Sequence, residues 1–394
     1  MSITCANLAA PQGCNHTHAA RHEAISIPPF ASSLPCNALC FNTMSTETAS
    51  SNLTVNPLAH FQVTLNPDGT LNRDRFVFPD TSASPDPIPS AGPVLSKDIP
   101  INPSHNTWAR IFLPHHHARS CSEEKLPLIV YYHGGGFILC SPASNIFHEL
   151  CITLARELSA VVVSVKYRLA PEHQLPLAYD DAVEALHWIK TAREEWLVEH
   201  ADLSTCYLMG SSAGGNLAFH AGLRTSASPE GLEPLKIRGL ILHHPFFGGT
   251  QRTPSELRLA NNHILPLAAI DLMWELSLPL GVDRDHEYCN LAVDGSSKLS
   301  EGVDKMRSLG WRLLVTGCDG DPLIDRQVEL VKLLKEKGLR VVSDFTEGGY
   351  HINEAIEPDK SQPLVLTLKS FMSTTVAGQD AVGPPNGISM QIAA

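Results

Sequence analysis

The 394-residue sequence lacks several features that would assign it to a broad class at once. No uncharged apolar run approaches the ~20 residues of a membrane-spanning helix, and this excludes a transmembrane helix. Basic residues are scarce: 29 Lys and Arg face 41 Asp and Glu, and the formal charge of −12 argues against nucleic acid or an anionic membrane as a main partner. The ten cysteines show no Cys-x-x-Cys pair and no zinc-type spacing, so we expect free thiols and no disulfide framework.

The first 50 residues differ from the rest of the chain. Before Glu47 they contain a single acid, Glu23, and a single Arg, Arg21, among many Ala, Ser and Asn. A secretory signal needs a basic start and an apolar stretch of about 7–15 residues, and neither is present. An acid-poor, Ala/Ser-rich leader favours a transit peptide and a plastid location. The alternatives are a disordered tail, or translation starting at Met44, with a cytoplasmic location.

Histidine clusters are present, but their positions do not favour metal binding. The first, His16, His18 and His22, falls in the leader, and the second, His115-His116-His117, separates an apolar stretch from a polar loop. We therefore predict no metal and no cofactor.

From about residue 53 onward, short apolar runs alternate with helical periods. Runs rich in β-branched residues predict strands buried on both faces. Helical periods between them predict a mostly parallel sheet covered by helices on both sides, the α/β class. The expected strands are Leu126–Tyr132, Ala160–Val165, Thr205–Gly210, Ile237–His243, Trp311–Thr316 and Leu339–Phe345, and the expected helices are Tyr179–Trp196, Ala213–Arg224, Asp325–Lys337 and Leu364–Met372.

The domain organisation follows from this alternation. Length alone allows two or three domains, but the motifs described below must meet at one sheet edge. We therefore predict a single domain over residues 53–375, with a disordered leader at 1–50 and a disordered tail at 376–394. The mostly helical stretch Thr250–Val282 interrupts the alternation, and we interpret it as a helical cap over the active edge.

A candidate nucleophile stands between a strand and a helix. Gly210-Ser211-Ser212-Ala213-Gly214 fits Gly-x-Ser-x-Gly, in which small residues allow a tight strand-to-helix turn that presents the central Ser212. The helix N-terminus that follows favours developing negative charge near Ser212. Ser211 occupies the x position and is not the nucleophile.

A glycine run follows the first buried strand, at His133-Gly134-Gly135-Gly136-Phe137. Acyl transfer places charge on a carbonyl oxygen, and fixed backbone N–H groups stabilise that charge. We assign N–H groups of Gly134, Gly135 and Gly136, together with that of Ala213, to an oxyanion hole. A phosphate loop is disfavoured because the Walker Lys-Ser/Thr ending and the G-x-G-x-x-G spacing are missing.

A nucleophilic serine needs a base and an acid that orients the base. In this arrangement the chain order is Ser, then acid, then His. His351 follows the last expected strand, whereas His243, His244 and His286 precede any suitable acid. For the acid, Asp319, Asp321 and Asp325 compete after the strand that ends at Thr316; we favour Asp321 over Asp319 and interpret Asp325 as a helix N-cap.

From residues 66–69 to about Met372, the chain resembles the plant carboxylesterases of the hormone-sensitive-lipase-like branch of the α/β-hydrolase superfamily. The resemblance implies a catalytic triad of Ser212, Asp321 and His351 and no cofactor. The motifs that carry it are Tyr132-His133-Gly134-Gly135-Gly136-Phe137, Tyr167-Arg168-Leu169-Ala170-Pro171-Glu172-His173, Tyr179-Asp180-Asp181-Ala182, 210–215 and 320–325.

The sequence departs from the family pattern at two positions. Lys166 and Ser211 stand where relatives commonly have an acid, which favours a polar or anionic substrate. Retention of His351 disfavours the alternative of a hormone receptor without turnover, because the related gibberellin receptor has lost that histidine. The aromatic residues Phe137, Phe246, Phe247 and Trp274 fit either the substrate pocket or the core.

The predicted function is hydrolysis of a small-molecule carboxylic ester through an acyl-enzyme, by a monomer or homodimer. A second hypothesis is lactone formation, in which a hydroxyl of the acyl group replaces water, as in tuliposide-converting relatives with plastid leaders. Both hypotheses fit a role in specialised metabolism, and the triad does not separate them.

Overall fold

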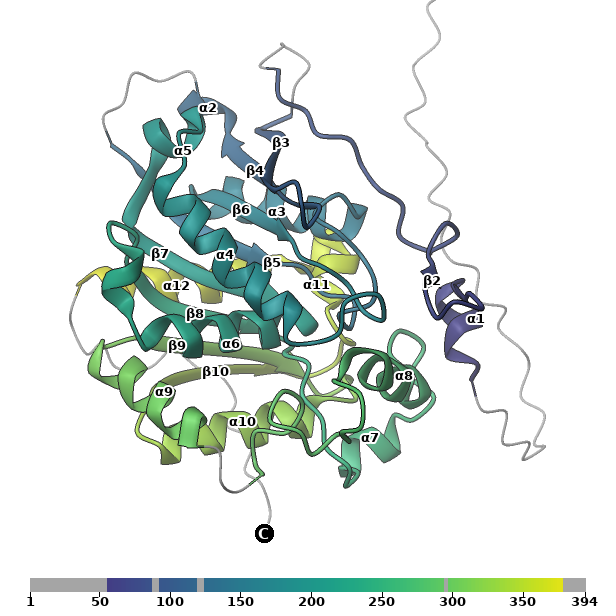
Figure 1. The fold of residues 1–394 in the computed structure, drawn as a ribbon. Helices are drawn as coiled ribbons and strands as arrows, with labels where there is room; N and C mark the ends of the chain where they lie inside the picture. The colour runs from purple at the N-terminus through teal and green to yellow at the C-terminus, as the bar shows by residue number, and fades with distance from the viewer. Residues whose placement is uncertain (1–54, 87–91, 119–123, 294–296, 378–394) are drawn as a thin grey trace, which may run out of the picture. The chain divides into compact units, whose positions relative to one another are not determined.

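The computed structural model describes residues 55–86, 92–118, 124–293 and 297–377, and Figure 1 shows how they are arranged. The predicted leader (1–50) lies outside the described residues, as do residues 378–394 of the predicted tail. No helix in the described ranges is long and apolar enough to cross a bilayer.

Eight of the described strands form one central sheet, in the order β10-β9-β8-β7-β5-β6-β4-β3. Adjacent strands from β10 to β6 pair in parallel, and the hairpin of β3 and β4 adds an antiparallel edge beside β6. The strands are β3 (Val94–Asn102), β4 (Thr107–Pro114), β5 (Leu126–Tyr132), β6 (Val161–Lys166), β7 (Ala201–Ser211), β8 (Ile237–His243), β9 (Arg312–Cys318) and β10 (Arg340–Thr346). A separate two-stranded sheet joins β1 (Thr64–Leu65) to β2 (Leu71–Asn72).

Helices cover both faces of the central sheet (Figure 1). Two buried clusters reflect this, because successive side chains of a strand point to opposite faces: Leu128 and Val130 of β5 belong to one cluster, and Ile129 and Tyr131 to the other. The helices are α1 (Pro57–Phe61), α2 (His115–Ala118), α3 (Asn145–Leu158), α4 (Leu177–Thr191), α5 (Glu195–His200), α6 (Ala213–Ser226), α7 (Pro254–Arg258), α8 (Leu267–Ser277), α9 (Ser297–Ser308), α10 (Ile324–Glu336), α11 (Asn353–Ile356) and α12 (Gln362–Ala377), with 3-10 turns at Pro229–Leu232 and Pro358–Lys360.

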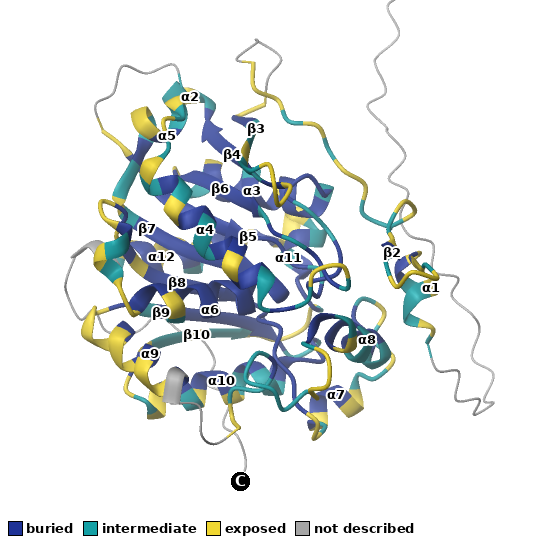
Figure 2. Ribbon diagram, viewed as in Figure 1, coloured by how far each residue is buried: buried dark blue, intermediate teal, exposed yellow. Residues whose placement is uncertain are grey.

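Burial follows the expected pattern for an enclosed parallel sheet. Strands β5 to β9 are buried along most of their length, whereas the edge strand β10 is only partly covered (Figure 2). The six strands expected from the sequence are all present, with ends shifted by a few residues. The described cysteines Cys140, Cys151, Cys206, Cys289 and Cys318 are free, as expected.

Two helix assignments made from the sequence are wrong. The helix expected over Tyr179–Trp196 is divided into α4 and α5, because Ala192 takes an extended conformation and the Glu194 side chain accepts a hydrogen bond from Leu197 N–H, starting a new helix. Asp325 is not an N-cap: α10 begins at Ile324, and the Asp325 carboxylate accepts a hydrogen bond from the backbone N–H of Ser255 (2.7 Å).

Candidate active site

Ser212 lies at the sharp turn between β7 and α6. Its backbone takes φ 56° and ψ −119°, a sparsely populated conformation that costs of order 1–3 kcal/mol and that marks a nucleophile elbow. The turn closes so tightly that a Cβ atom on Gly210 would overlap the backbone of Gly214, and one on Gly214 would overlap the carbonyl of Tyr132. The glycines on both sides of Ser212 therefore have a steric reason.

His351 lies between Ser212 and Asp321. The Ser212 Oγ is 2.8 Å from Nε2 of His351, and Nδ1 of His351 is 2.8 Å from Oδ2 of Asp321. With the proton on Nδ1, the ring donates to the carboxylate and accepts from the hydroxyl. All three side chains are buried. The structure thus brings together the nucleophile, base and acid expected from the sequence.

The carboxylate of Asp321 is held by donors on every side. Besides His351, it accepts hydrogen bonds from Gln327 Nε2 (2.9 Å) and from the backbone N–H of Leu323 (2.9 Å). Burial opposes its ionisation, but the charges and hydrogen bonds of His351 and His244 outweigh burial and hold the pKa of Asp321 well below its usual range. Asp319 instead accepts from the backbone N–H of Gly348 (2.7 Å), so it braces the loop before His351.

The glycine run after β5 lies against Ser212. A Cβ atom on Gly134 would stand 3.2 Å from the Cβ of Ser212. Gly135 and Gly136 have positive φ, 109° and 59°, which glycine adopts without the steric cost of a Cβ. No described residue accepts a hydrogen bond from the backbone N–H groups of these three glycines. Ala213 is the first residue of α6, where the helix leaves its N–H without an internal partner.

Two neighbouring elements hold the glycine run in place. The guanidinium of Arg73 donates to the carbonyls of Ile138 (2.6 Å) and Ala170 (2.7 Å) and pairs with Glu172. From the other side, the Met273 side chain of α8 packs so closely that a Cβ atom on Gly136 would overlap its sulfur. Helix α8 therefore contacts the active edge, as expected for the cap segment.

Comparison with known proteins agrees with this geometry. Residues 129–353 match the family described as alpha/beta hydrolase fold. The chain is 52% identical to Carboxylesterase 20 of Arabidopsis thaliana over 319 residues, covering 80% of this chain and 96% of the relative. It is 49% identical to 3-O-acetylpapaveroxine carboxylesterase CXE2 of Papaver somniferum, covering 70% and 90% of the two chains.

The chain belongs to the plant carboxylesterases of the α/β-hydrolase superfamily. A solved esterase from the archaeon Pyrobaculum calidifontis is similar in fold, with a TM-score of 0.58, 27% identity and coverage of 72% of this chain and 83% of the esterase. The predicted fold class and family are therefore confirmed.

The aromatic residues considered for the pocket of this carboxylesterase all lie in the core. Phe246 stacks on Trp274 with ring centroids 4.7 Å apart, and Phe137 packs against both rings. Phe247 is buried beside Phe219. These side chains attach α8 to the glycine run.

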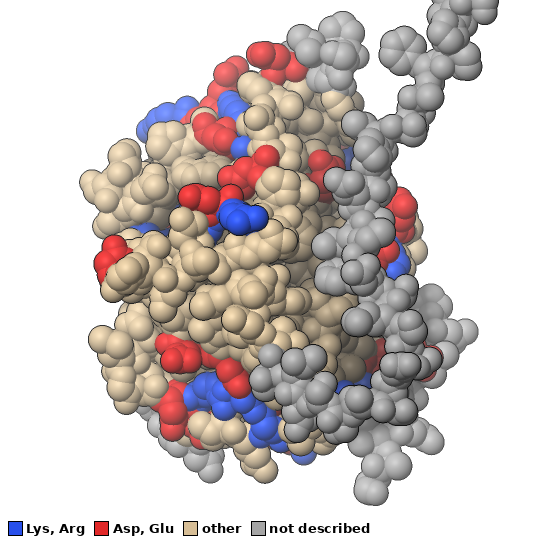
Figure 3. All heavy atoms as spheres, turned by 90° about the vertical axis from the view of Figure 1, so that its right-hand side faces the viewer, with Lys and Arg blue, Asp and Glu red and all other residues tan. Residues whose placement is uncertain are grey.

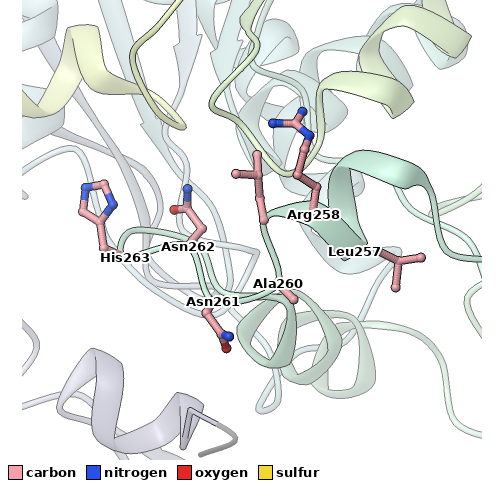
Figure 4. A pocket seen from close by; sticks show the side chains of 7 residues that line it. Leu257, Arg258, Ala260, Asn261, Asn262 and His263 are labelled. Carbon is pink, nitrogen blue, oxygen red and sulfur yellow. The ribbon is translucent and has the colours of Figure 1, made fainter. Parts of the chain in front are cut away.

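A hollow of about 380 Å³ lies on the segment between α7 and α8, and the side chains of Arg258, Asn262 and His263 project from it to one side (Figure 4). Arg258 donates to the carbonyl of Asp319 (3.3 Å) and Asn262 to that of Gly320 (3.2 Å). The His263 ring packs against the ring of Tyr350, the residue before His351, at 5.1 Å. The hollow does not include Ser212, but the residues that line it contact the loops that carry Asp321 and His351.

A carboxylate of the short helix α11 reaches the side chains around Ser211. Ser211 Oγ is 2.7 Å from Tyr131 Oη and 2.7 Å from His243 Nδ1, and His243 Nε2 is 3.2 Å from Oε2 of Glu354. His244, on the other side of the same carboxylate, reaches Asp321. Sequence reasoning excluded His243 and His244 as the base and overlooked this network; their position directly at the end of β8 was the available signal.

Lys166 ends β6 and is largely enclosed. Burial, together with the charge of Arg73, lowers its pKa to about 8, against the opposing charges of Asp80 and Glu172. Figure 3, which looks onto the side where α7 and α8 lie, shows small charged groups of both signs on a mostly uncharged visible surface. A polar or anionic substrate, inferred from Lys166 and Ser211, stays a prediction.

Within the described ranges, three groups of side chains are spaced closely enough to hold a metal ion. Two of them contain His244, one with Glu354 and the other with Asp321. The third consists of His105, Asp181 and Glu184, and there the Asp181 carboxylate is already paired with Arg168. The histidines His115, His116 and His117 form the one-turn helix α2 and belong to none of these groups. The cluster of His16, His18 and His22 lies outside the described residues.

Proposed function

We propose that the chain is a serine carboxylesterase that hydrolyses a small-molecule ester through an acyl-enzyme on Ser212. The observation that carries the proposal is the row Ser212–His351–Asp321, with 2.8 Å at both hydrogen bonds. A nucleophile, a base and an orienting acid at these distances meet the geometric requirement for nucleophilic catalysis. The names of the plant relatives support the same reaction class.

The reaction proceeds in two halves. His351 takes the proton from Ser212 as the Oγ attacks the ester carbonyl, and Asp321 stabilises the imidazolium that forms. The carbonyl oxygen becomes negative and is stabilised by N–H groups of Gly134, Gly135 or Gly136 and of Ala213. His351 then protonates the leaving alcohol, and a water molecule, activated by the same ring, releases the acid.

A chromogenic ester tests the nucleophile. With a p-nitrophenyl ester we expect a burst of nitrophenol and an acyl adduct on the peptide that contains Ser212, detected by mass spectrometry. The variant Ser212→Ala should lose several orders of magnitude in kcat, whereas Ser308→Ala, an exposed serine on α9, should not. Full turnover by Ser212→Ala would refute the proposal, and binding without a burst would favour a receptor.

Lactone formation uses the same acyl-enzyme and differs only in the group that attacks it. If the acyl chain carries a hydroxyl, that hydroxyl can replace water and close a ring. Turnover of hydroxyacyl sugar esters in ¹⁸O-labelled water distinguishes the two outcomes, because hydrolysis places the label in the acid and lactone formation does not. Hydrolysis is the reaction we propose.

The remaining proposals concern the cell and the assembly. We propose that residues 1–50 direct the chain to the plastid and are removed there, with 53–375 as the catalytic domain. A fluorescent fusion with and without residues 1–50, and N-terminal sequencing of the mature protein, test this. Size-exclusion chromatography with light scattering tests the expected monomer or homodimer.

A further inference from the structure

The carboxylate of Asp321 is shared by two histidines, and the mechanism above uses only one. His351 Nδ1 and His244 Nδ1 each lie 2.8 Å from the same oxygen, Oδ2. The two rings meet edge to face with centroids 5.6 Å apart. His244 is completely buried and its ring contacts Asp321, not Ser212, so it acts through Asp321.

The backbone at His244 is strained. Its φ is 47°, in the left-handed region that costs a residue with a Cβ roughly 1–2 kcal/mol, and its N–H donates to the carbonyl of Thr316 (3.0 Å). Glycine would adopt this conformation without the steric cost of a Cβ, and histidine is one of the other residues that adopt it more often than most. The backbone therefore accommodates a histidine here, and the contacts of its ring determine what the residue does.

The other side of the His244 ring faces a second carboxylate. Its Nε2 is 3.4 Å from Oε2 of Glu354, and the ring therefore stands between two acids. We propose that His244 is a positioning residue, a cation shared by Asp321 and Glu354. It holds the Asp321 carboxylate in place and neutralises part of the negative charge with which Asp321 acts on His351.

The electrostatics of the cluster agree with this geometry. Burial disfavours a charged His244, but its hydrogen bond with Asp321 and the nearby charges of Asp321 and Glu354 outweigh burial and raise its pKa to about 9. Burial likewise opposes the charge on Glu354, yet His243 and His244 hold its pKa well below the usual range. The titratable groups around His244 are Asp321, Glu354, His243 and His351, and the thiol of Cys318 lies near both carboxylates.

The shared cation would affect proton transfer with a definite sign. The positive charge of His244 lies beside the Asp321 oxygen that also accepts the hydrogen bond from His351. This charge makes the protonated form of His351 less stable, which favours delivery of its proton to the leaving alcohol. Removing the charge of His244 should therefore make His351 hold its proton more tightly. Removing the negative charge of Glu354 leaves the positive charge of His244 less neutralised. His351 should then hold its proton less tightly.

This inference rests on the proposed esterase function, and its test uses the pH profile of kcat/KM with a p-nitrophenyl ester. The acid limb of that profile reports protonation of the general base. His244→Asn keeps a donor toward Asp321 and suits the left-handed backbone, but removes the charge; its acid limb should move up by about one pH unit. Glu354→Gln should move the limb down.

Controls separate this role from simple packing. His220→Asn removes another buried histidine, stacked on Tyr179 at 4.5 Å, and should lower stability without moving the limb. Shifts of the same sign in His244→Asn and Glu354→Gln, or no shift in either, would overturn the inference. Activity retained by Ser212→Ala would instead overturn the esterase proposal, so the two failures are distinguishable.

A measurement on the wild-type chain covers the case in which the variants do not fold. In ¹⁵N-histidine-labelled protein at pH 7.5, we expect both ring nitrogens of one slowly exchanging histidine to carry protons, as in an imidazolium. Selective broadening of that resonance after phosphonylation of Ser212 would place it at the active edge. A spectrum with only neutral rings would contradict a cationic His244.

Discussion

Substitution of Gly136 by alanine tests whether the glycine run forms the oxyanion hole. Gly136 has φ 59°, so an alanine there costs about 1–2 kcal/mol in backbone strain. Its new Cβ would also overlap the Met273 sulfur of α8. Because the backbone must shift or Met273 must rotate, the N–H groups of the run move relative to Ser212. We expect kcat/KM to fall about 100-fold, equivalent to about 2.7 kcal/mol at 1.36 kcal/mol per decade.

Two further variants separate the causes of that loss. Met273→Ala removes the side chain that the new Cβ meets, so Gly136→Ala/Met273→Ala should recover to within about tenfold of Met273→Ala alone, as a coupled pair in contact should. Gly69→Ala is the matched control: φ is 85°, no atom lies within 4 Å of its Cβ position, and the residue lies in the turn between β1 and β2. It should lower stability by a similar strain and leave kcat unchanged.

The assay is steady-state hydrolysis of p-nitrophenyl acetate, with urea unfolding of each variant to measure stability separately. A Gly136→Ala enzyme that loses stability as Gly69→Ala does but keeps its kcat/KM would refute the oxyanion role. An equal loss of activity with and without Met273 would refute the steric part of the reasoning.

Three other predictions follow from the same geometry. Asp321→Asn should reduce kcat by about 10⁴-fold, as loss of the orienting acid does in other triads, while Asp319→Asn retains most activity in the same nitrophenyl assay. Arg73→Ala should lower both Tm and kcat/KM because it releases the Ile138 and Ala170 carbonyls, and Arg73→Lys should not restore them, since a single ammonium cannot replace the planar guanidinium. Urea unfolding measured against pH should show the greatest stability near pH 6.5. Burial lowers the pKa of His133 and of His220 to about 3, so the free energy of unfolding falls as the pH drops below 6.5, by about 1.4 kcal/mol per pH unit for each histidine. The raised pKa of a third histidine, about 9, removes its contribution as the pH rises from 6.5 to 9. The histidines concerned are His133 and His220 for the acid side and His244 for the alkaline side.

The features that could be predicted from the sequence are those with a local cause. Buried parallel strands need continuous apolar runs, so β5 through β9 are visible as short apolar runs, of which β6 is the richest in β-branched residues. The elbow needs glycines beside Ser212, and the chain order of α/β-hydrolases then selects Asp321 and His351. Each of these signals lies within a few residues or follows from the topology.

The features that were missed depend on contacts that no local pattern records. The edge strand β3 carries charged Lys97 and Asp98 and is of mixed burial, so it lacks the apolar run of a central strand. The pairing of His244 with Asp321 joins residues 77 positions apart, and it depends on how the loops after β8 and β9 close. A search for one base and one acid also stops once His351 and Asp321 are found.

The position before the nucleophile shows why an apparent loss of charge in a motif is a poor guide to the charge of a site. A carboxylate at position 211 would lie between Tyr131 and His243, in a buried space where Glu354 already supplies a negative charge to His243. Two carboxylates around one neutral imidazole repel each other strongly at low dielectric. A small hydroxyl at 211 avoids that repulsion and still satisfies both neighbours by hydrogen bonding. The carboxylate that serves this site is therefore Glu354 of the short helix α11, which follows His351, and the buried edge has a negative charge although the residue before Ser212 is a serine.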